Sequence, residues 1–155
     1  MDGMNRRDVL GALSALALLG LGAPGAEAQA VGNTTDMAKS TVFHFDQMPL
    51  SHNANGGWGR MVMHGTLPTG EFVELHETML PAGKMPHPPH KHSHSEFLLI
   101  REGKLEFLDE GTPMPAGPGD VVYTASNRLH GLKNVGTTDA MYFVVAVGVQ
   151  SKSEG

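Results

Sequence analysis

Residues 83–103 read GKMPHPPHKHSHSEFLLIREG, and this stretch decides the fold. Its second half, Glu96–Arg101, has the apolar composition of a short β-strand. Residues two apart on an extended strand share a face, so four potential metal ligands fall on one side: His90, His92, His94 and Glu96. The pattern favours a metal-binding edge. Strand parity does not choose among the three histidines, and the alternative is a solvated histidine-rich loop that collects metals adventitiously.

The remainder of the chain also predicts strands. After Val31 no 3.6-residue periodicity is sustained over three turns, whereas β-branched, aromatic and aliphatic runs are interrupted by Gly, Pro and Asn. We predict eight strands, at Thr41–Phe45, Arg60–His64, Phe72–Leu80, Glu96–Arg101, Lys104–Leu108, Val121–Thr124, Gly131–Asn134 and Ala140–Val147. Short strands without crossover helices indicate an all-β antiparallel sandwich or barrel.

Two connections between these strands carry their own signals. Ser51–Gly59 is rich in Asn and Gly and predicts a surface loop, with Trp58 folding back as its anchor. Between Gly103 and Gly119 there is room for a strand, a turn at Asp109–Thr112 and a returning strand.

The first thirty residues predict a cleavable signal peptide. The uncharged apolar run from Val9 to Ala23 is shorter than the roughly 20 residues that span a bilayer. Small-x-small cleavage patterns follow it within 26–30. Arg6 and Arg7 precede it, and their surroundings resemble a twin-arginine export signal that lacks the usual serine and lysine. An ordinary Sec signal and a buried N-terminal helix are the alternatives. We expect export to the bacterial periplasm or beyond, without permanent membrane insertion.

Composition narrows the chemistry of the mature chain. The protein has no Cys, nine His and a formal net charge of −5. Disulfides, thiolate zinc sites and a cysteine nucleophile are therefore excluded, and a metal site must consist of imidazole and carboxylate. The sequence has no basic stripe of the kind that would indicate nucleic-acid binding. We expect a signal peptide at 1–30, a linker at 31–40, one domain at 41–149 and a polar tail at 150–155.

The histidine stretch resembles the first sequence motif of the cupin superfamily, Gly-x5-His-x-His-x3,4-Glu-x6-Gly. His90 and His92 match the histidine pair, Glu96 follows at the permitted spacing, and Gly103 holds the final position. Gly83 lies one residue further from His90 than the motif specifies, so the loop before His90 is slightly longer than in the motif.

A second passage, GDVVYTASNRLHGLKN at 119–134, resembles the second cupin motif, Gly-x5-Pro-x-Gly-x2-His-x3-Asn. Its glycine, histidine and asparagine are kept as Gly119, His130 and Asn134. Ala125 replaces the proline and Asn127 the second glycine. Asn tolerates positive φ better than most residues, so we expect the turn to survive.

The resemblance implies a double-stranded β-helix, the jelly-roll barrel of cupins, holding one metal ion in its interior. The implied ligands are His90, His92, Glu96 and His130. Three imidazoles and one carboxylate leave two open positions on an octahedral divalent ion. We expect Mn or Fe first, with Ni, Co or Zn as alternatives.

Glu74 and His76 share a face on the strand Phe72–Leu80. If that face lines the barrel interior, they are the best acid–base or substrate-contact candidates. If it faces solvent, they have no role. The opposite face of this strand carries the alternating apolar residues, which slightly favours solvent.

Further residues are expected around the metal. His94 lies outside the motif and is expected at the mouth or in contact with a ligand. Leu98 and Ile100 have the parity of Glu96 and should form an apolar pocket floor. Tyr123 and Asn134 are expected to pack near the second motif.

Cupins include oxygenases, isomerases, decarboxylases, lyases and binding proteins, so the resemblance leaves the reaction open. The first hypothesis is a small-molecule oxygenase. Non-redox Lewis-acid chemistry, with Glu74 or His76 moving protons, is the second. A module that binds a metal or small ligand without catalysis is the third. A homodimer is expected from the resemblance alone.

Overall fold

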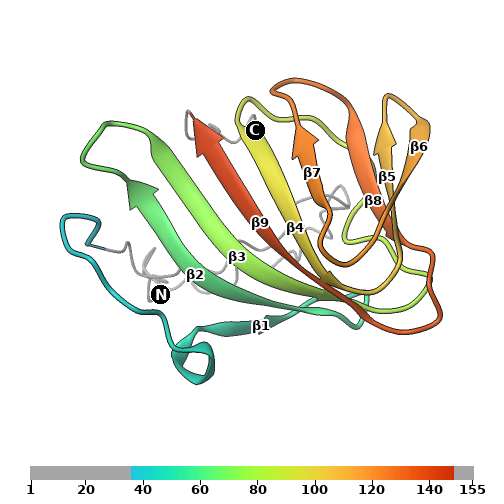
Figure 1. The fold of residues 1–155 in the computed structure, drawn as a ribbon, viewed down its shortest axis with the longest axis horizontal. Coiled ribbons are helices and arrows are strands. Elements are labelled where there is room, and N and C mark those ends of the chain that lie inside the picture. The colour runs from blue at the N-terminus through green and yellow to red at the C-terminus, as the bar shows by residue number, and fades with distance from the viewer. Residues whose placement is uncertain (1–35, 149–155) are drawn as a thin grey trace, which may run out of the picture.

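Antiparallel β-strands make up most of residues 36–148, the part of the chain that this computed structural model describes (Figure 1). The strands are β1 (Leu50–His52), β2 (Trp58–Thr66), β3 (Phe72–Leu80), β4 (Ser95–Glu102), β5 (Leu105–Asp109), β6 (Thr112–Ala116), β7 (Val121–Thr124), β8 (His130–Asn134) and β9 (Ala140–Gly148). A short 3-10 helix, η1 (Phe45–Gln47), precedes them. The predicted signal peptide and the polar tail lie outside the described residues.

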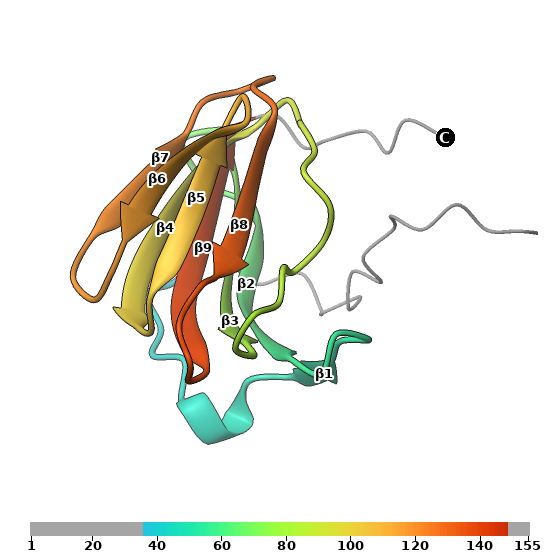
Figure 2. The ribbon, with the colours of Figure 1, turned by 90° about the vertical axis from the view of Figure 1, so that its right-hand side faces the viewer.

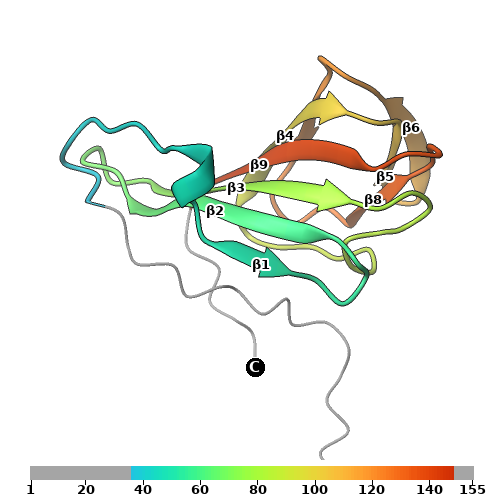
Figure 3. The ribbon, with the colours of Figure 1, turned by 90° about the horizontal axis from the view of Figure 1, so that it is seen from below.

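The strands form two sheets that face each other. The larger sheet has six strands in the order β1-β2-β3-β9-β4-β7, and the smaller has three in the order β6-β5-β8. Figures 1 and 2 show the small sheet packed across from β4, β7 and β9, and Figure 3 shows the large sheet curving toward it. The predicted all-β jelly roll is confirmed. Within the described range there is no helix of the length and apolarity needed to cross a bilayer.

The hydrophobic core lies between the two sheets. Strand β9 alternates buried and partly buried residues along its length, as a strand with one covered face should. Leu98 and Ile100 of β4 are 5% and 4% exposed and belong to this core, so both lie inside the barrel. Leu105 and Phe107 of β5 meet them from the small sheet.

The N-terminal part of the fold differs from the sequence prediction. Thr41–Phe45 forms no strand, and the segment passes instead into η1. The cause is Arg60 of β2, whose Nη1 donates hydrogen bonds to the carbonyls of Phe45 and Met48 and whose guanidinium lies 4.3 Å from the Phe45 ring centroid. The predicted loop at Ser51–Gly59 is also wrong at its ends, because β1 occupies 50–52 and β2 begins at Trp58.

The predicted turn after β5 is confirmed. Glu110 and Gly111 connect β5 to β6 with φ of 49° and 84°. Positive φ at both central residues is the signature of the tight hairpin turn that matches the twist of antiparallel strands. Strand β6 carries Pro113 and Pro115, which a sheet tolerates at its edge, and β6 is an edge strand of the small sheet.

Candidate metal centre

Two segments far apart in sequence are joined by their backbones at the histidine cluster. His90 lies in the long connection between β3 and β4, and His130 begins β8. Each donates its N–H to the carbonyl of the other, and both hydrogen bonds are 2.9 Å long. This reciprocal pair brings the two imidazole rings to a centroid separation of 4.6 Å.

His92 completes a group of three imidazoles. One ring nitrogen from each of His90, His92 and His130 lies within 4.8 Å of the other two. The nitrogens His90 Nδ1 and His130 Nε2 are buried and have no hydrogen-bond partner in the described structure, and the buried His92 Nε2 has only the Glu96 carboxylate beside it. Buried polar atoms normally have partners. A divalent ion would satisfy all three, so the residues fit a metal.

Glu96, at the start of β4, supplies the carboxylate. Its Oε1 lies 3.2 Å from His92 Nε2 and its Oε2 lies 3.7 Å from His130 Nε2. The side chain is 16% exposed. The structure therefore brings together all four residues that the cupin resemblance implied as ligands.

The backbone orients two of the imidazoles. The Nδ1 atoms of His92 and His130 lie 2.9 Å from the carbonyl oxygens of His94 and Arg128, respectively. A carbonyl can only accept, so each Nδ1 carries a proton, and Nε2 is the ring nitrogen that faces the cluster. This is the usual way in which a metal-binding histidine is fixed by its surroundings.

Burial and neighbouring charges prepare the ligands for a cation. Burial, with the nearby His87 and His130, lowers the pKa of His90 to about 4, and burial also lowers the pKa of His130. Burial alone would raise the pKa of Glu96, but His92 and His94 outweigh it and hold that pKa well below its ordinary value. At neutral pH the cluster therefore presents neutral imidazoles at His90 and His130 beside a carboxylate.

His92 departs from this pattern in the metal-free cluster. Burial opposes its protonation, but the adjacent Glu96 carboxylate outweighs burial and raises the pKa of His92. A metal ion would compete with that proton, because only the neutral imidazole binds metals.

His94 lies closer to the cluster than a rim residue. Its ring stacks on His92 at a centroid distance of 3.6 Å, nearly parallel at 8°, and its Nε2 is 3.0 Å from Glu96 Oε1. His92, His94 and Glu96 form a second group whose ligand atoms lie within 4.8 Å of one another. His94 thus contacts a predicted ligand, as expected. Its ring nitrogen is also close enough to His92 and Glu96 to bind the same metal ion.

Glu74 and His76 lie on the inner face of β3. Glu74 is in register with Ala146 of β9, and Ala146 is in register with Glu96 of β4. Directly paired residues of adjacent strands point to the same side, so Glu74 faces the interior with Glu96. Its Oε1 lies 3.3 Å from His76 Nδ1. The slight preference for a solvent-facing position of Glu74 and His76 is therefore wrong.

Two residues predicted near the pocket lie elsewhere. Tyr123 is 57% exposed and contacts Phe97 on the outer face of the large sheet, with ring centroids 5.2 Å apart. Asn134 is fully buried, but its Nδ2 donates to the carbonyls of Leu80 and Thr138. It closes the turn after β8 and does not line the metal centre.

Sequence reasoning missed two polar residues of the interior. Thr124 is paired with Glu96 in register, is 2% exposed and has no hydrogen-bond partner for its hydroxyl. Strand alternation could have identified Thr124 from the sequence, because consecutive residues of a strand point to opposite sides and Tyr123 points outward. His64 of β2 is paired with Glu74, and its Nδ1 is likewise buried without a partner. No sequence motif marks His64.

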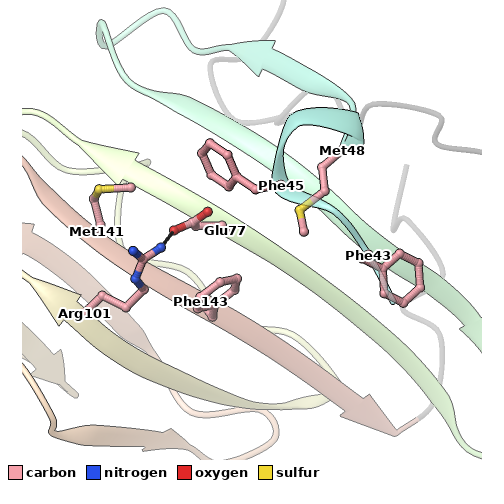
Figure 4. A pocket seen from close by; sticks show the side chains of 7 residues that line it. All are labelled: Phe43, Phe45, Met48, Glu77, Arg101, Met141 and Phe143. Carbon is pink, nitrogen blue, oxygen red and sulfur yellow. Dashed lines mark hydrogen bonds and ion pairs between the residues drawn. The ribbon is translucent and has the colours of Figure 1, made fainter. Parts of the chain in front are cut away.

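A pocket of about 490 Å³ lies on the outer face of the large sheet, away from the histidines (Figure 4). Its walls are apolar, from Phe43, Phe45 and Met48 on one side and from Met141 and Phe143 on β9. The polar part of the pocket lining is the ion pair between Glu77 and Arg101. Glu77 is fully buried, whereas 44% of the Arg101 side chain is exposed.

Comparison with known proteins agrees with this architecture. Residues 76–146 match the family model described as a cupin domain. An oxalate-binding protein from Thermotoga maritima is 30% identical over 99 residues, which cover 63% of this chain and 70% of that protein.

Two solved structures resemble the fold. A structure described as a predicted oxalate decarboxylase from Thermotoga maritima has a TM-score of 0.56 and 25% identity, covering 70% of this chain and 100% of the other. A sugar phosphate isomerase of the cupin superfamily from Silicibacter pomeroyi has a TM-score of 0.60 and 16% identity, covering 70% and 76%, respectively. With both motifs in place around one histidine cluster, the chain belongs to the cupin superfamily.

Proposed function

We propose that this cupin is a small-molecule metalloenzyme that uses one divalent ion, Mn or Fe by preference, for oxygenase-type chemistry. The observation that carries the proposal is the convergence of His90, His92 and His130 with unpartnered buried nitrogens beside Glu96. Such a ligand set leaves positions on the ion open. A bound ion of this kind supplies Lewis acidity and a site for oxygen and substrate.

The chain's own residues would prepare the substrate. Glu74 and His76, inside the barrel, are placed to accept or return a proton at the Glu74 carboxylate. The buried side chains of Leu98 and Ile100 keep the barrel interior apolar beyond Glu96. Thr124 offers an unpartnered hydroxyl next to that carboxylate.

Metal content and oxygen consumption test the proposal together. The purified protein should contain close to one equivalent of transition metal. The Fe(II)-loaded form should consume oxygen with a member of a panel of phenols and diketones. A His92→Ala/His130→Ala variant should do neither, whereas His52→Ala, on the outlying strand β1, should behave as the wild type. Metal binding without oxygen uptake on any substrate would contradict the oxygenase part.

Non-redox chemistry is the second candidate, favoured by the Glu74–His76 pair in the interior. An isomerase, hydrolase or lyase would turn over its substrate without oxygen and with Zn(II) or Mn(II) in place of Fe(II). Replacing Glu74 by Gln would then slow turnover while leaving metal content unchanged.

A binding protein without catalysis is the third candidate, favoured by the relative described as an oxalate-binding protein. Calorimetric titration of the metal-loaded protein with small carboxylic acids would show tight binding and no product. Detection of a product from the bound acid would exclude this candidate.

We also propose that the protein is exported through the signal at 1–30, because Arg6 and Arg7 precede an apolar run and small-x-small cleavage patterns. Cell fractionation of the bacterial host followed by N-terminal sequencing tests this. An Arg6→Lys/Arg7→Lys variant that is still exported would favour Sec over the twin-arginine route.

A homodimer through the outer face of the large sheet is a further part of the proposal. Phe97, Leu99, Val121 and Tyr123 are 40% to 61% exposed there and lie side by side in the β4–β7 register. Contiguous exposed apolar surface of this kind usually marks an interaction site.

A further inference from the structure

We propose that Glu74 selects the charge of the substrate: it disfavours a ligand with a second carboxylate and favours one that presents a hydrogen-bond donor on the side away from the metal. This inference rests on the proposed metal-dependent function of the site and names its substrate class. It concerns the half of the barrel interior opposite the metal ligands.

The placement of Glu74 follows from the strand register. Glu74, Ala146 and Glu96 form one row across β3, β9 and β4 and point to the same side. Adjacent strands lie about 4.8 Å apart, so the Cα atoms of the two glutamates are separated by about 10 Å. The residue between them in this row is Ala146, whose side chain is a single methyl group.

Glu74 is an anion in this position. Its side chain is 22% exposed. The contact with His76 outweighs burial and lowers the pKa of Glu74, and His64 and His94 act in the same direction. His94, which acts on Glu74, also contacts Glu96. In this proposal the Glu74 carboxylate faces the far side of a ligand bound to the metal.

Among residues 36–148, the charged groups that act on Glu74 are imidazoles, with no Lys or Arg among them. Its near neighbours are the imidazoles of His64, in register on β2, and His76. Ionised carboxylates accept hydrogen bonds and donate none, so Glu74 would accept from a hydroxyl, amine or amide of the ligand. A second ligand carboxylate would instead place two negative charges close together in a partly buried site, which is unfavourable.

The ligand class that fits is a small molecule that chelates the metal through oxygen and carries a neutral donor at its other end. Oxamate is such a molecule, whereas oxalate has nearly the same shape and a carboxylate in place of the amide. A comparison of oxamate with oxalate therefore tests the effect of the second negative charge at nearly constant size and mode of chelation.

The experiment uses the full mature chain, loaded with Co(II) so that metal binding is read separately from its absorption spectrum. Wild type, Glu74→Gln and Glu106→Gln are compared at pH 8.0, where an ordinary imidazole is neutral. Glu106 is the matched control, because it loses the same charge from the outer side of β5. Oxalate and oxamate are then titrated by calorimetry. The ratio of their dissociation constants is compared with the ratio for free Co(II) in the same buffer.

We expect Glu74→Gln to shift the ratio toward oxalate by about tenfold or more, and Glu106→Gln to leave it unchanged. Wild-type protein alone should favour oxamate relative to the free ion, a comparison that needs no variant to fold. Equal ratios for wild type, Glu74→Gln and free Co(II) would overturn the inference while the metal site stood. Failure of wild-type protein to bind Co(II) would overturn the proposed function itself.

Discussion

The tautomers of two histidines connect the fold to the metal chemistry. The carbonyls of His94 and Arg128 hold the Nδ1 protons of His92 and His130, so the Nε2 atoms face the cluster before any metal arrives. Imidazoles oriented in advance lose little conformational freedom when they bind. The affinity of the site should therefore depend on single imidazoles.

Replacement of one imidazole tests this dependence. We expect His130→Ala to weaken Co(II) binding by about a hundredfold or more, because it removes one of the four ligands. His52→Ala removes an exposed imidazole from β1 and serves as the control. The measurement is a Co(II) titration followed by absorbance. Equal affinity of His130→Ala and wild type would exclude His130 as a ligand.

The metal-free protein should lose stability in weak acid. The pKa of His90 falls from an ordinary 6.5 to about 4 on folding, so between these values the unfolded chain binds more protons than the folded one. The contribution of His90 is thus complete above pH 6.5 and is lost as the pH falls toward 4. Glu96, whose pKa is also lowered, adds a further loss below its ordinary value of 4.5.

Urea unfolding of metal-free protein between pH 7.5 and 4 measures this loss. The His90→Asn variant lacks the titrating imidazole and should show a flatter dependence between pH 6.5 and 4.5. A wild-type midpoint that does not change between pH 6.5 and 4.5, the range in which the contribution of His92 is constant, would contradict the prediction.

Much of this site was predictable at the level of single residues, and the exceptions have physical causes. The motif spacing identified the histidine pair, Glu96 and His130, because ligand spacing is fixed by the barrel. Tyr123 was placed wrongly because its aromatic ring suggested packing, whereas the strand alternation turns it outward and buries Thr124. Asn134 satisfies backbone carbonyls, a role that is visible only once the turn has closed.

The loop before β8 depends on one residue with unusual backbone conformation. Asn127 has φ of 59°, and its N–H donates to the carbonyl of His92 at 2.7 Å. As the sequence suggested, Asn here replaces the glycine of the motif. The loop is thereby tied to the chain segment that carries a predicted ligand.

Substitution at Asn127 should follow backbone strain. Asn127→Ala should destabilise the protein by about 1 kcal/mol, since Ala has a β-carbon but lacks the short polar side chain that lets Asn tolerate positive φ. Asn127→Gly should be within a few tenths of a kcal/mol of wild type, because glycine adopts this φ freely. Thermal unfolding of both variants measures the difference. An Asn127→Ala variant as stable as Asn127→Gly would show that the loop relaxes.

The Glu77–Arg101 pair on the outer face should matter more when it is broken than when it is removed. Arg101→Met leaves the fully buried Glu77 without its cation, and we expect a loss of about 1–3 kcal/mol. The lower end of that range applies to the extent that solvent screens the half-exposed Arg101. Glu77→Leu combined with Arg101→Met should restore most of the loss, as chemical denaturation would show. A double variant less stable than Arg101→Met would contradict this.

Elements were predicted best where the periodicity was strict. Strand β9 ends one residue beyond its predicted bounds and buries alternate residues along most of its length, whereas β3 matches its predicted bounds without a regular alternation of burial. Thr41–Phe45 has strand-like composition but no strand, because Arg60 donates hydrogen bonds to the carbonyls of Phe45, at its end, and of Met48. Tertiary hydrogen bonds of this kind override the local preference for a β-strand, and the sequence of the segment itself does not reveal them.

At the scale of the molecule, the outer sheet face should govern assembly. Leu99→Lys puts a charge in the middle of the exposed apolar surface of β4 and β7, and should shift the protein toward a monomer in light scattering coupled to size exclusion. Met114→Lys introduces the same charge on edge strand β6 and serves as the control. A wild type that is monomeric at tens of micromolar would exclude the proposed dimer.

The global fold could be predicted, whereas the substrate could not. Two motifs and a succession of short strands are sufficient to specify a jelly roll, because few architectures close such strands without exposed edges. The interior face of β3 depends on pairing with β9, which local sequence does not encode. The positions of Glu74 and His64 therefore required the register.

The reciprocal backbone hydrogen bonds between His90 and His130 have a kinetic consequence. Because the peptide groups of these residues are already paired, the loop and strand do not need the ion to stay together. The amides of His90 and His130 should therefore exchange slowly with deuterium in protein stripped of metal. An ion could then leave and be replaced without local unfolding, at a rate set by ligand dissociation rather than by opening of the barrel.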